Sequence, residues 1–171
     1  MGLRPGKCYS TLKRPYTRVS THKPRKSYVK GVPYPKIRSF EMGRPNPEFS
    51  AKLSLVAKYG VQIRHNALEA ARVAANKVLE KEAGNGLYFL KVLVFPHHVL
   101  RENPIATGAG ADRYQTGMRL SFGNPIGTAA RVKKGQHIIE ARVLPSKKSV
   151  AKKALKVASS KLPVPCVIEG I

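Results

Sequence analysis

The residues best suited to chemistry in this sequence are regularly spaced cations, and the chemistry they suit is phosphate binding. Lysine recurs every four residues at Lys148, Lys152 and Lys156. On a helix this spacing puts the three ammonium groups on one face. The other face is apolar, with Ala151 and Leu155 among its members. The pattern predicts a helix that packs one side on a core and turns the other toward phosphates.

Other residue types that often carry catalysis do not form a site. His97 and His98 are adjacent, so on a strand they point to opposite faces and cannot share a metal ion. Cys8 and Cys166 have no metal-binding spacing, and the nine acids are scattered. Residues 108–113 resemble the start of a dinucleotide-binding loop but lack its third glycine and its following helix. We therefore expect no enzyme activity, no metal and no cofactor.

The charge balance indicates the kind of partner. The chain of 171 residues has 32 Lys and Arg against 9 Asp and Glu, a net charge of +23. Such a charge repels itself unless a polyanion neutralises it. The cations are spread along the whole chain rather than beside a hydrophobic anchor, which argues against a membrane. With no signal peptide and two free thiols, we expect a cytoplasmic protein that binds nucleic acid.

Residues 1–47 form a separate compositional block with twelve Lys and Arg, one acid and seven prolines. The prolines disfavour helices and strand ladders, so the block is predicted to be an extended basic arm. Tyrosines 9, 16, 28 and 34 lie between the cations and suit stacking on bases or riboses. We expect the amides of this arm to exchange rapidly in the free protein and to be protected on RNA.

Residues 48–171 have the pattern of a globular domain. A helix is predicted with Asn66 as its N-cap and Gly84 at its end, and Leu68, Ala71 and Leu79 share its apolar face. A second helix is predicted over 146–160. Strands are predicted over 53–57, 61–63, 87–95, 129–132, 137–144 and 164–168. This order predicts an α+β fold of two layers, with both helices on one face of a mainly antiparallel sheet.

A long glycine-rich loop over residues 101–118 interrupts this pattern. Its core is "GAGADRYQTGMR", residues 108–119, which has neither helical nor strand periodicity. Glycine lets a backbone enter a crowded cleft where side chains would clash. Arg101, Arg113 and Arg119 can contact phosphates, and Asp112 can cap amides of the loop itself.

The same loop carries a resemblance to a known family. "AGADRYQTGMR" (109–119) and "FGNPIGTAARV" (122–132) resemble the universal large-subunit ribosomal protein sixteen family, in its archaeal and eukaryotic form. The segments "LRPGKCY" (3–9), "KGVPYPKIRSFEMG" (30–43) and "KKALKVASSKLPVP" (152–165) extend the resemblance to both ends of the chain.

This resemblance implies a structural protein bound to large-subunit rRNA and to neighbouring ribosomal proteins, with its loop directed toward tRNA near the peptidyl-transferase centre. The residues expected to contact rRNA are the basic residues Arg4, Lys7, Lys13, Arg14, Arg18, Lys23, Arg25, Lys26, Lys30, Lys36, Arg38, Arg44, Arg64, Arg131, Lys133, Lys134, Lys148, Lys152 and Lys156. Those expected near tRNA are the loop residues Arg101, Asn103, Gly108, Gly110, Asp112, Arg113, Gln115, Gly117 and Arg119.

A protein that packs DNA in a nucleoid or chromatin is the alternative that the charge also allows. The single irregular loop argues against it, because such a loop suits a folded RNA cleft better than a repeating duplex. Sedimentation of a cell lysate separates the two hypotheses, since the protein would travel with ribosome-like particles in one case and with genomic DNA in the other.

Overall fold

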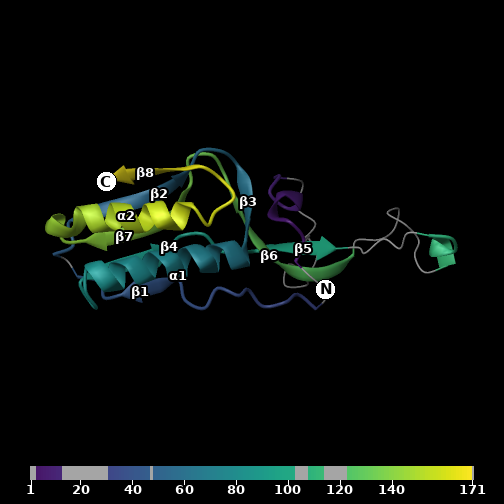
Figure 1. Ribbon diagram of the computed structural model, residues 1–171, viewed down its shortest axis with the longest axis horizontal. Helices are drawn as coiled ribbons and strands as arrows, with labels where there is room; N and C mark the ends of the chain where they lie inside the picture. The colour runs from purple at the N-terminus through teal and green to yellow at the C-terminus, as the bar shows by residue number, and fades with distance from the viewer. Residues whose placement is uncertain (1–2, 13–30, 47, 103–107, 114–122, 171) are drawn as a thin grey trace, which may run out of the picture.

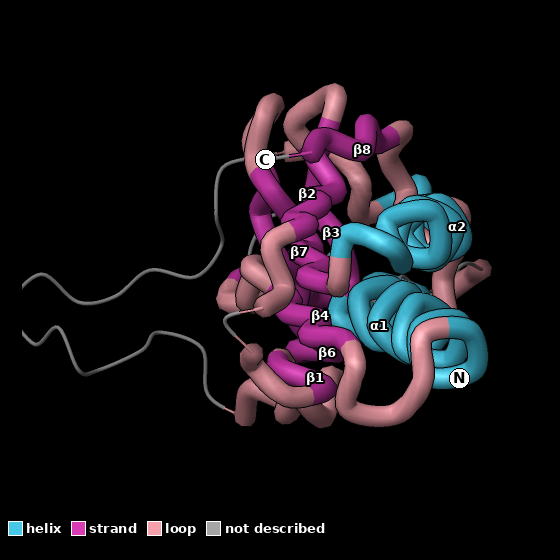
Figure 2. The backbone as a smooth tube through the Cα atoms, turned by 90° about the vertical axis from the view of Figure 1, so that its left-hand side faces the viewer, coloured by secondary structure: helices cyan, strands magenta, loops and turns pink. Residues whose placement is uncertain are grey.

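The computed structural model describes residues 3–12, 31–46, 48–102, 108–113 and 123–170. It confirms the α+β class, with two helices on one face of antiparallel β-structure (Figures 1 and 2). The described strands form two sheets, one of five strands and one of three, and neighbouring strands within each sheet are antiparallel. The predicted arm and glycine-rich loop both include residues outside the described ranges.

The larger sheet has the strand order β1-β4-β7-β2-β8. Its strands are β1 (Glu41–Gly43), β2 (Ala51–Ala57), β4 (Tyr88–Val92), β7 (His137–Val143) and β8 (Cys166–Gly170). The register places Leu55 opposite Ile139 and Leu90 opposite Ala141. These four side chains are fully buried, so this face of the sheet forms one wall of the core.

The smaller sheet has the order β3-β6-β5 and lies beside the larger one (Figure 1). Its strands are β3 (Val61–Arg64), β5 (His98–Glu102) and β6 (Asn124–Val132). β6 runs through a turn at residues 133–136 into β7, so this turn connects the two sheets. The amide of Gly135 in this turn donates to the carbonyl of Ala57, 2.9 Å away, and ties the turn to the end of β2.

Helices α1 (His65–Glu82) and α2 (Lys148–Ser159) pack against each other and against the larger sheet (Figure 2). The alanines that face inward, Ala71 and Ala75 on α1 and Ala151 and Ala154 on α2, are fully buried. Small side chains at these positions let the helix axes approach each other and the sheet closely. Three short 3-10 turns complete the described elements: η1 (Gly6–Cys8), η2 (Ala111–Arg113) and η3 (Pro145–Lys147).

Several element boundaries differ from the sequence predictions. α1 begins at His65 with Arg64 as its N-cap, so Asn66 lies inside the first turn, where its Oδ1 accepts from the amide of Ala67. β4 ends at Val92, three residues before the predicted end. β6 begins at Asn124, five residues before the predicted start. These ends depend on pairing with strands far along the chain, which periodicity does not report.

Two strands were missed altogether. β5 begins after the predicted strand ends at residue 95 and includes the first two residues of the predicted loop, 101 and 102, and β1 lies within the predicted arm. β1 ends at Gly43, which has a φ of +82°, and a Cβ there would lie 2.0 Å from the carbonyl oxygen of Tyr88. Only glycine allows the two strands to approach this closely. The last part of the arm therefore pairs with the sheet through a contact that composition does not reveal.

Candidate nucleic-acid interface

The lysine row of α2 is present as predicted. Lys148, Lys152 and Lys156 are all exposed, while Ala151 and Leu155 of the same helix are fully buried. In the described part of the chain, none of these lysines forms an ion pair with a carboxylate. Lys148 is also the first residue of α2, at the positive end of the helix dipole, where a cation is unfavourable. This row therefore concentrates positive potential that a phosphate would relieve.

Lys153 on the same helix, unlike these three lysines, has a carboxylate partner among the described residues. Its Nζ pairs with the Oε1 of Glu82 on α1, and the Lys153 side chain is 61% exposed. Because this lysine already has a counter-charge, it has less to gain from a phosphate than its neighbours. Spacing alone did not separate paired from unpaired lysines on this helix.

A second basic group lies at the turn between β6 and β7. Lys133 and Lys134 are exposed in the turn, and Arg131 is exposed near the end of β6. The side chain of Gln136 closes the turn, because its Oε1 accepts from the amide of Lys133 at 2.8 Å. The hydrogen-bonded turn fixes the backbone from which these cations extend.

A third basic group lies on residues 31–40, the segment before β1, which runs beside α1 (Figure 1). Lys36 and Arg38 are exposed, and Ile37 between them is buried in the core. This alternation turns the two cations outward while the isoleucine anchors the segment. Further along, the amide of Arg44 donates to the carbonyl of Tyr88, 3.2 Å away, and the Arg44 side chain is exposed.

Two residues of α1 hold this segment, and sequence reasoning did not identify either of them. The amide of Lys36 donates to Nδ1 of His65 over 3.1 Å, and the amide of Arg38 donates to Oε2 of Glu69 over 3.3 Å. Glu69 also accepts two hydrogen bonds from Arg72, at 2.9 and 2.6 Å. In the sequence prediction Glu69 lies in the first turn of the helix and His65 lies just before it, and neither position indicates a distant partner.

The electrostatics of these two residues follow from their contacts. Burial, followed by the charges of Lys36 and Arg64, lowers the pKa of His65, so its imidazole stays neutral and Nδ1 can accept. The hydrogen bonds from Arg72 are the main cause that lowers the pKa of Glu69, which stays ionised. Both groups are thus in the form needed to hold the basic segment.

The first residues of the chain are attached to the smaller sheet. Arg4 forms an ion pair with Glu102, and Nη1 of Arg64 donates to the Arg4 carbonyl over 2.9 Å. The Arg64 guanidinium also lies over the ring of Tyr9, 5.7 Å from its centroid. Lys7 is exposed beside them. Arg4 and Arg64, both expected to contact rRNA, thus already make contacts within the protein.

The described part of the long loop is open. Arg101 belongs to β5 and is half-buried, so it lies in a strand rather than in the loop. Gly108 and Gly110 have φ values of +135° and +80°, and a Cβ at either would meet nothing within 4 Å. Arg113 is exposed at the end of η2, which also includes Asp112. η2 lies beyond the smaller sheet, away from the helices (Figure 1).

The remaining predicted contact residues lie outside the described residues. They are Lys13, Arg14, Arg18, Lys23, Arg25, Lys26 and Lys30 of the arm, and Asn103, Gln115, Gly117 and Arg119 of the loop.

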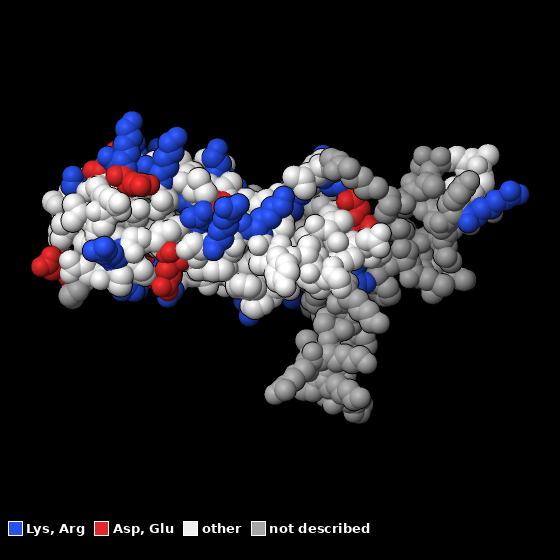
Figure 3. Space-filling model, turned by 90° about the horizontal axis from the view of Figure 1, so that it is seen from below, with Lys and Arg blue, Asp and Glu red and all other residues white. Residues whose placement is uncertain are grey.

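The basic groups lie on different sides of the molecule. The α2 row lies in the helix layer, the segment before β1 runs along the lower edge in Figure 1, and η1 lies beside the smaller sheet. In Figure 3, Lys and Arg stand along the upper edge and across the middle of the visible face, and acidic side chains lie beside some of them. Such a distribution suits a polyanion that surrounds the protein on several sides.

The described residues contain neither a metal site nor a membrane-spanning helix. Among the described residues, no group of three or more His, Cys, Asp or Glu side chains could hold a metal ion. His98 is buried and His97 exposed, as expected of neighbours near the start of a strand. Neither of the described helices is long and apolar enough to cross a membrane.

Comparison with known proteins identifies the family. A family model described as ribosomal protein L16p/L10e matches residues 16–169. The large ribosomal subunit protein uL16 of Methanococcus maripaludis is 50% identical over 169 residues, which cover 98% of this chain and 94% of that protein. The proteins of the same name from Staphylothermus marinus and Archaeoglobus fulgidus are 52% and 48% identical, each over 98% of this chain and 93% and 92% of their own lengths. The chain therefore belongs to the ribosomal protein L16p/L10e family, whose members are structural proteins of the ribosome and not enzymes.

Proposed function

We propose that this protein is a structural component of the large ribosomal subunit that binds its rRNA through the exposed cations of α2, the β6–β7 turn and the segment before β1. The observation that carries this proposal is the lysine row of α2, which is exposed, without carboxylate partners in the described part of the chain, and mounted on a fully buried apolar face. The relatives bear the name of a large-subunit protein, in line with the expected cytoplasmic location.

The physical basis is the release of counterions from RNA. Each phosphate that a lysine or arginine neutralises frees condensed cations. The free energy of this counterion release dominates binding that is not specific for a nucleotide sequence. A duplex would require the cations to line one face. Here they lie on several sides, which favours folded RNA that encloses the protein over DNA packing. The family names support the same choice.

The proposal assigns a different task to the loop. Its tip has one exposed arginine in the described part, Arg113, and glycines at positions where a side chain would meet open space. Ordering such a segment costs chain entropy and adds few phosphate contacts. We assign it to the neighbourhood of tRNA at the peptidyl-transferase centre, where the RNA carries out the chemistry and the protein positions and stabilises.

The test measures how rRNA affinity depends on salt. Replacement of Lys148, Lys152 and Lys156 with Gln should weaken binding and lower the slope of log K against log salt by roughly 0.7–0.9 for each phosphate that is no longer neutralised. The matched control is Lys153→Gln on the same helix, which should change the slope less because Glu82 already neutralises Lys153. An unchanged slope in the triple variant would identify the row as a solvated surface and remove the main support for the proposal.

A further inference from the structure

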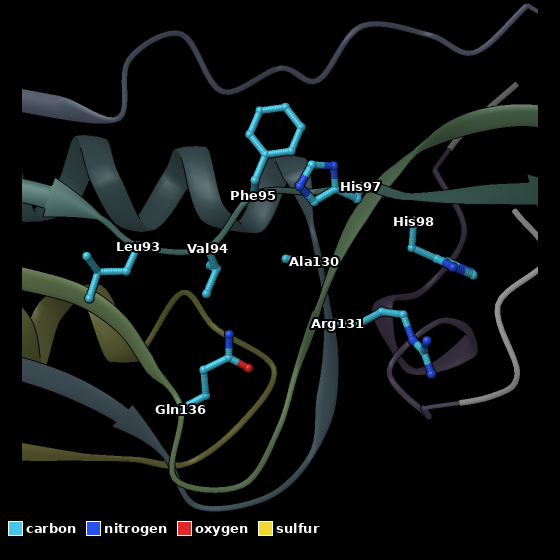
Figure 4. Close-up of a pocket in the computed structure, with 8 residues that line it drawn as sticks. All are labelled: Leu93, Val94, Phe95, His97, His98, Ala130, Arg131 and Gln136. Atoms are coloured by element: carbon cyan, nitrogen blue, oxygen red, sulfur yellow. The ribbon is translucent and has the colours of Figure 1, made fainter. Parts of the chain in front are cut away.

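A cavity of about 460 Å³ lies between the segment that joins β4 to β5 and the end of β6 with the turn that follows it (Figure 4). This volume is in the range of roughly 300–1,000 Å³ that small-molecule sites have. Leu93, Val94 and Phe95 line it from the β4–β5 segment, and Ala130 of β6 lies between Val94 and Arg131 in Figure 4. Leu93 and Phe95 are 41% and 44% exposed, so the apolar wall that they form is open to a ligand from outside the protein.

Three aromatic rings in series lead to this cavity. The rings of Phe40 and Phe95 stack with centroids 5.3 Å apart and an interplanar angle of 22°. The ring of His97 follows, 4.4 Å from Phe95 and tilted by 44°. His97 is exposed and lines the cavity, so the series ends at its rim with a ring that a further planar group can contact. Phe95 holds the His97 ring in place from behind.

Polar and cationic groups border the same space. The amide of Gln136 extends toward Val94 in Figure 4, and its Oε1 is already engaged by the amide of Lys133. The Gln136 amide nitrogen can therefore donate to a ligand. Arg131 lies at the other end of the cavity and adds positive charge. An aromatic surface, an amide donor and a cation are the features with which proteins hold an unstacked RNA base and its phosphate.

We propose that this cavity receives one nucleobase turned out of the surrounding rRNA, which stacks on His97 and lies between the β4–β5 segment and the β6–β7 connection. The inference rests on the proposed rRNA-binding function and adds a specific binding site to it. A phosphate alone would leave the apolar side chains exposed, and a peptide partner would not draw on the surplus of cations. A base with its phosphate uses both.

The experiment probes rRNA bases chemically in large subunits that carry the full-length wild-type chain or a variant. Dimethyl sulfate and a carbodiimide modify exposed base edges, and the same preparations are assayed for the amount of chain incorporated. The variants are His97→Ala, which removes the ring, and His97→Phe, which keeps a ring without its nitrogens. The matched control is Tyr59→Ala, because Tyr59 is an aromatic residue 62% exposed that does not line the cavity.

The expected result is one base, or one adjacent pair, that is protected in wild-type, His97→Phe and Tyr59→Ala subunits and becomes reactive in His97→Ala subunits. The loss of protection should correspond to a weakening of about 5- to 150-fold, the factor that one base–aromatic stack contributes. Incorporation of His97→Ala should stay close to wild type, since the phosphate contacts are unchanged.

Two outcomes would overturn the inference while leaving the proposed function intact. One is normal incorporation of His97→Ala with an unchanged pattern of base reactivity. The other is loss of protection in His97→Phe equal to that in His97→Ala, which would show that an imidazole nitrogen, not the ring surface, makes the contact. Failure of the wild-type chain to enter the subunit would instead refute the proposed function itself.

Discussion

Leu155 and Lys156 are neighbours on α2, but we expect Leu155 to stabilise the fold and Lys156 to bind rRNA. Substitution of each by alanine therefore tests folding and binding separately. Leu155 is fully buried in the core that α2 forms with α1 and the larger sheet, whereas Lys156 is exposed. Leu155→Ala removes apolar atoms from this core and leaves a space that the fully buried alanines around it, Ala151, Ala154 and Ala158, are too small to fill. We expect a loss of about 2–5 kcal/mol in the free energy of unfolding.

This loss is large compared with the stability of a domain, which is typically about 5–15 kcal/mol. For a chain of this size it corresponds to a fall in melting temperature of about 4–20 °C. Lys156→Ala keeps a good helix former on the solvent side, so its effect on stability should stay within about 0.5 kcal/mol. The rRNA affinity of Lys156→Ala, by contrast, should fall and depend less on salt.

The assay is urea unfolding of the free, full-length variants followed by far-UV circular dichroism, since the chain has no tryptophan. The unfolding midpoint should fall for Leu155→Ala while the slope with denaturant stays unchanged. A loss below about 1 kcal/mol would mean that α2 does not pack as the structure shows. Equal losses for the two variants would refute the assignment of buried and exposed faces.

The loop, α1 and β7 each lead to a further prediction. Replacing residues 103–115 with a Gly-Ser link should leave incorporation into the large subunit nearly intact but slow peptide-bond formation or weaken tRNA binding, and Arg113→Ala should have a milder effect. Both variants are measured on purified subunits. Failure of the shortened chain to incorporate would show that the loop anchors the protein to rRNA instead. The pKa of His65 is lowered in the folded state, so the unfolded chain binds the extra proton and stability should fall as the pH drops below about 6.5 toward the folded pKa. His65→Phe should flatten this dependence and speed exchange of the Lys36 amide, and an unchanged pH profile would exclude His65 as its source. Glu140 has only 7% of its side chain exposed and forms ion pairs with Lys52 and Arg142. Glu140→Gln should therefore lower the free energy of unfolding, measured with urea, by about 1–3 kcal/mol. No loss would show that these ion pairs do not contribute to stability.

The sequence by itself determined the features that depend on neighbours along the chain. The repeat of Leu68, Ala71 and Leu79 predicted the buried face of α1, and all three side chains are fully buried. The lysine spacing predicted the exposed face of α2 in the same way. Helical periodicity is a local signal, because residues three and four apart share a face whatever the rest of the chain does. The family could also be read from contiguous residues, in the loop at 109–119 and in the strand that follows it.

Tertiary structure alone decided which strands pair and which cations are already engaged. β1 pairs with β4, where Met42 lies opposite Leu90, and β6 and β7 follow each other in the chain but belong to different sheets. Arg4 meets Glu102, 98 residues away, and Lys153 meets Glu82, 71 residues away, so neither is as available to RNA as its charge suggests. Pairing across such separations depends on chain closure and on the geometry of both partners. No pattern within a short window reports it, and only the folded chain brings the partners together.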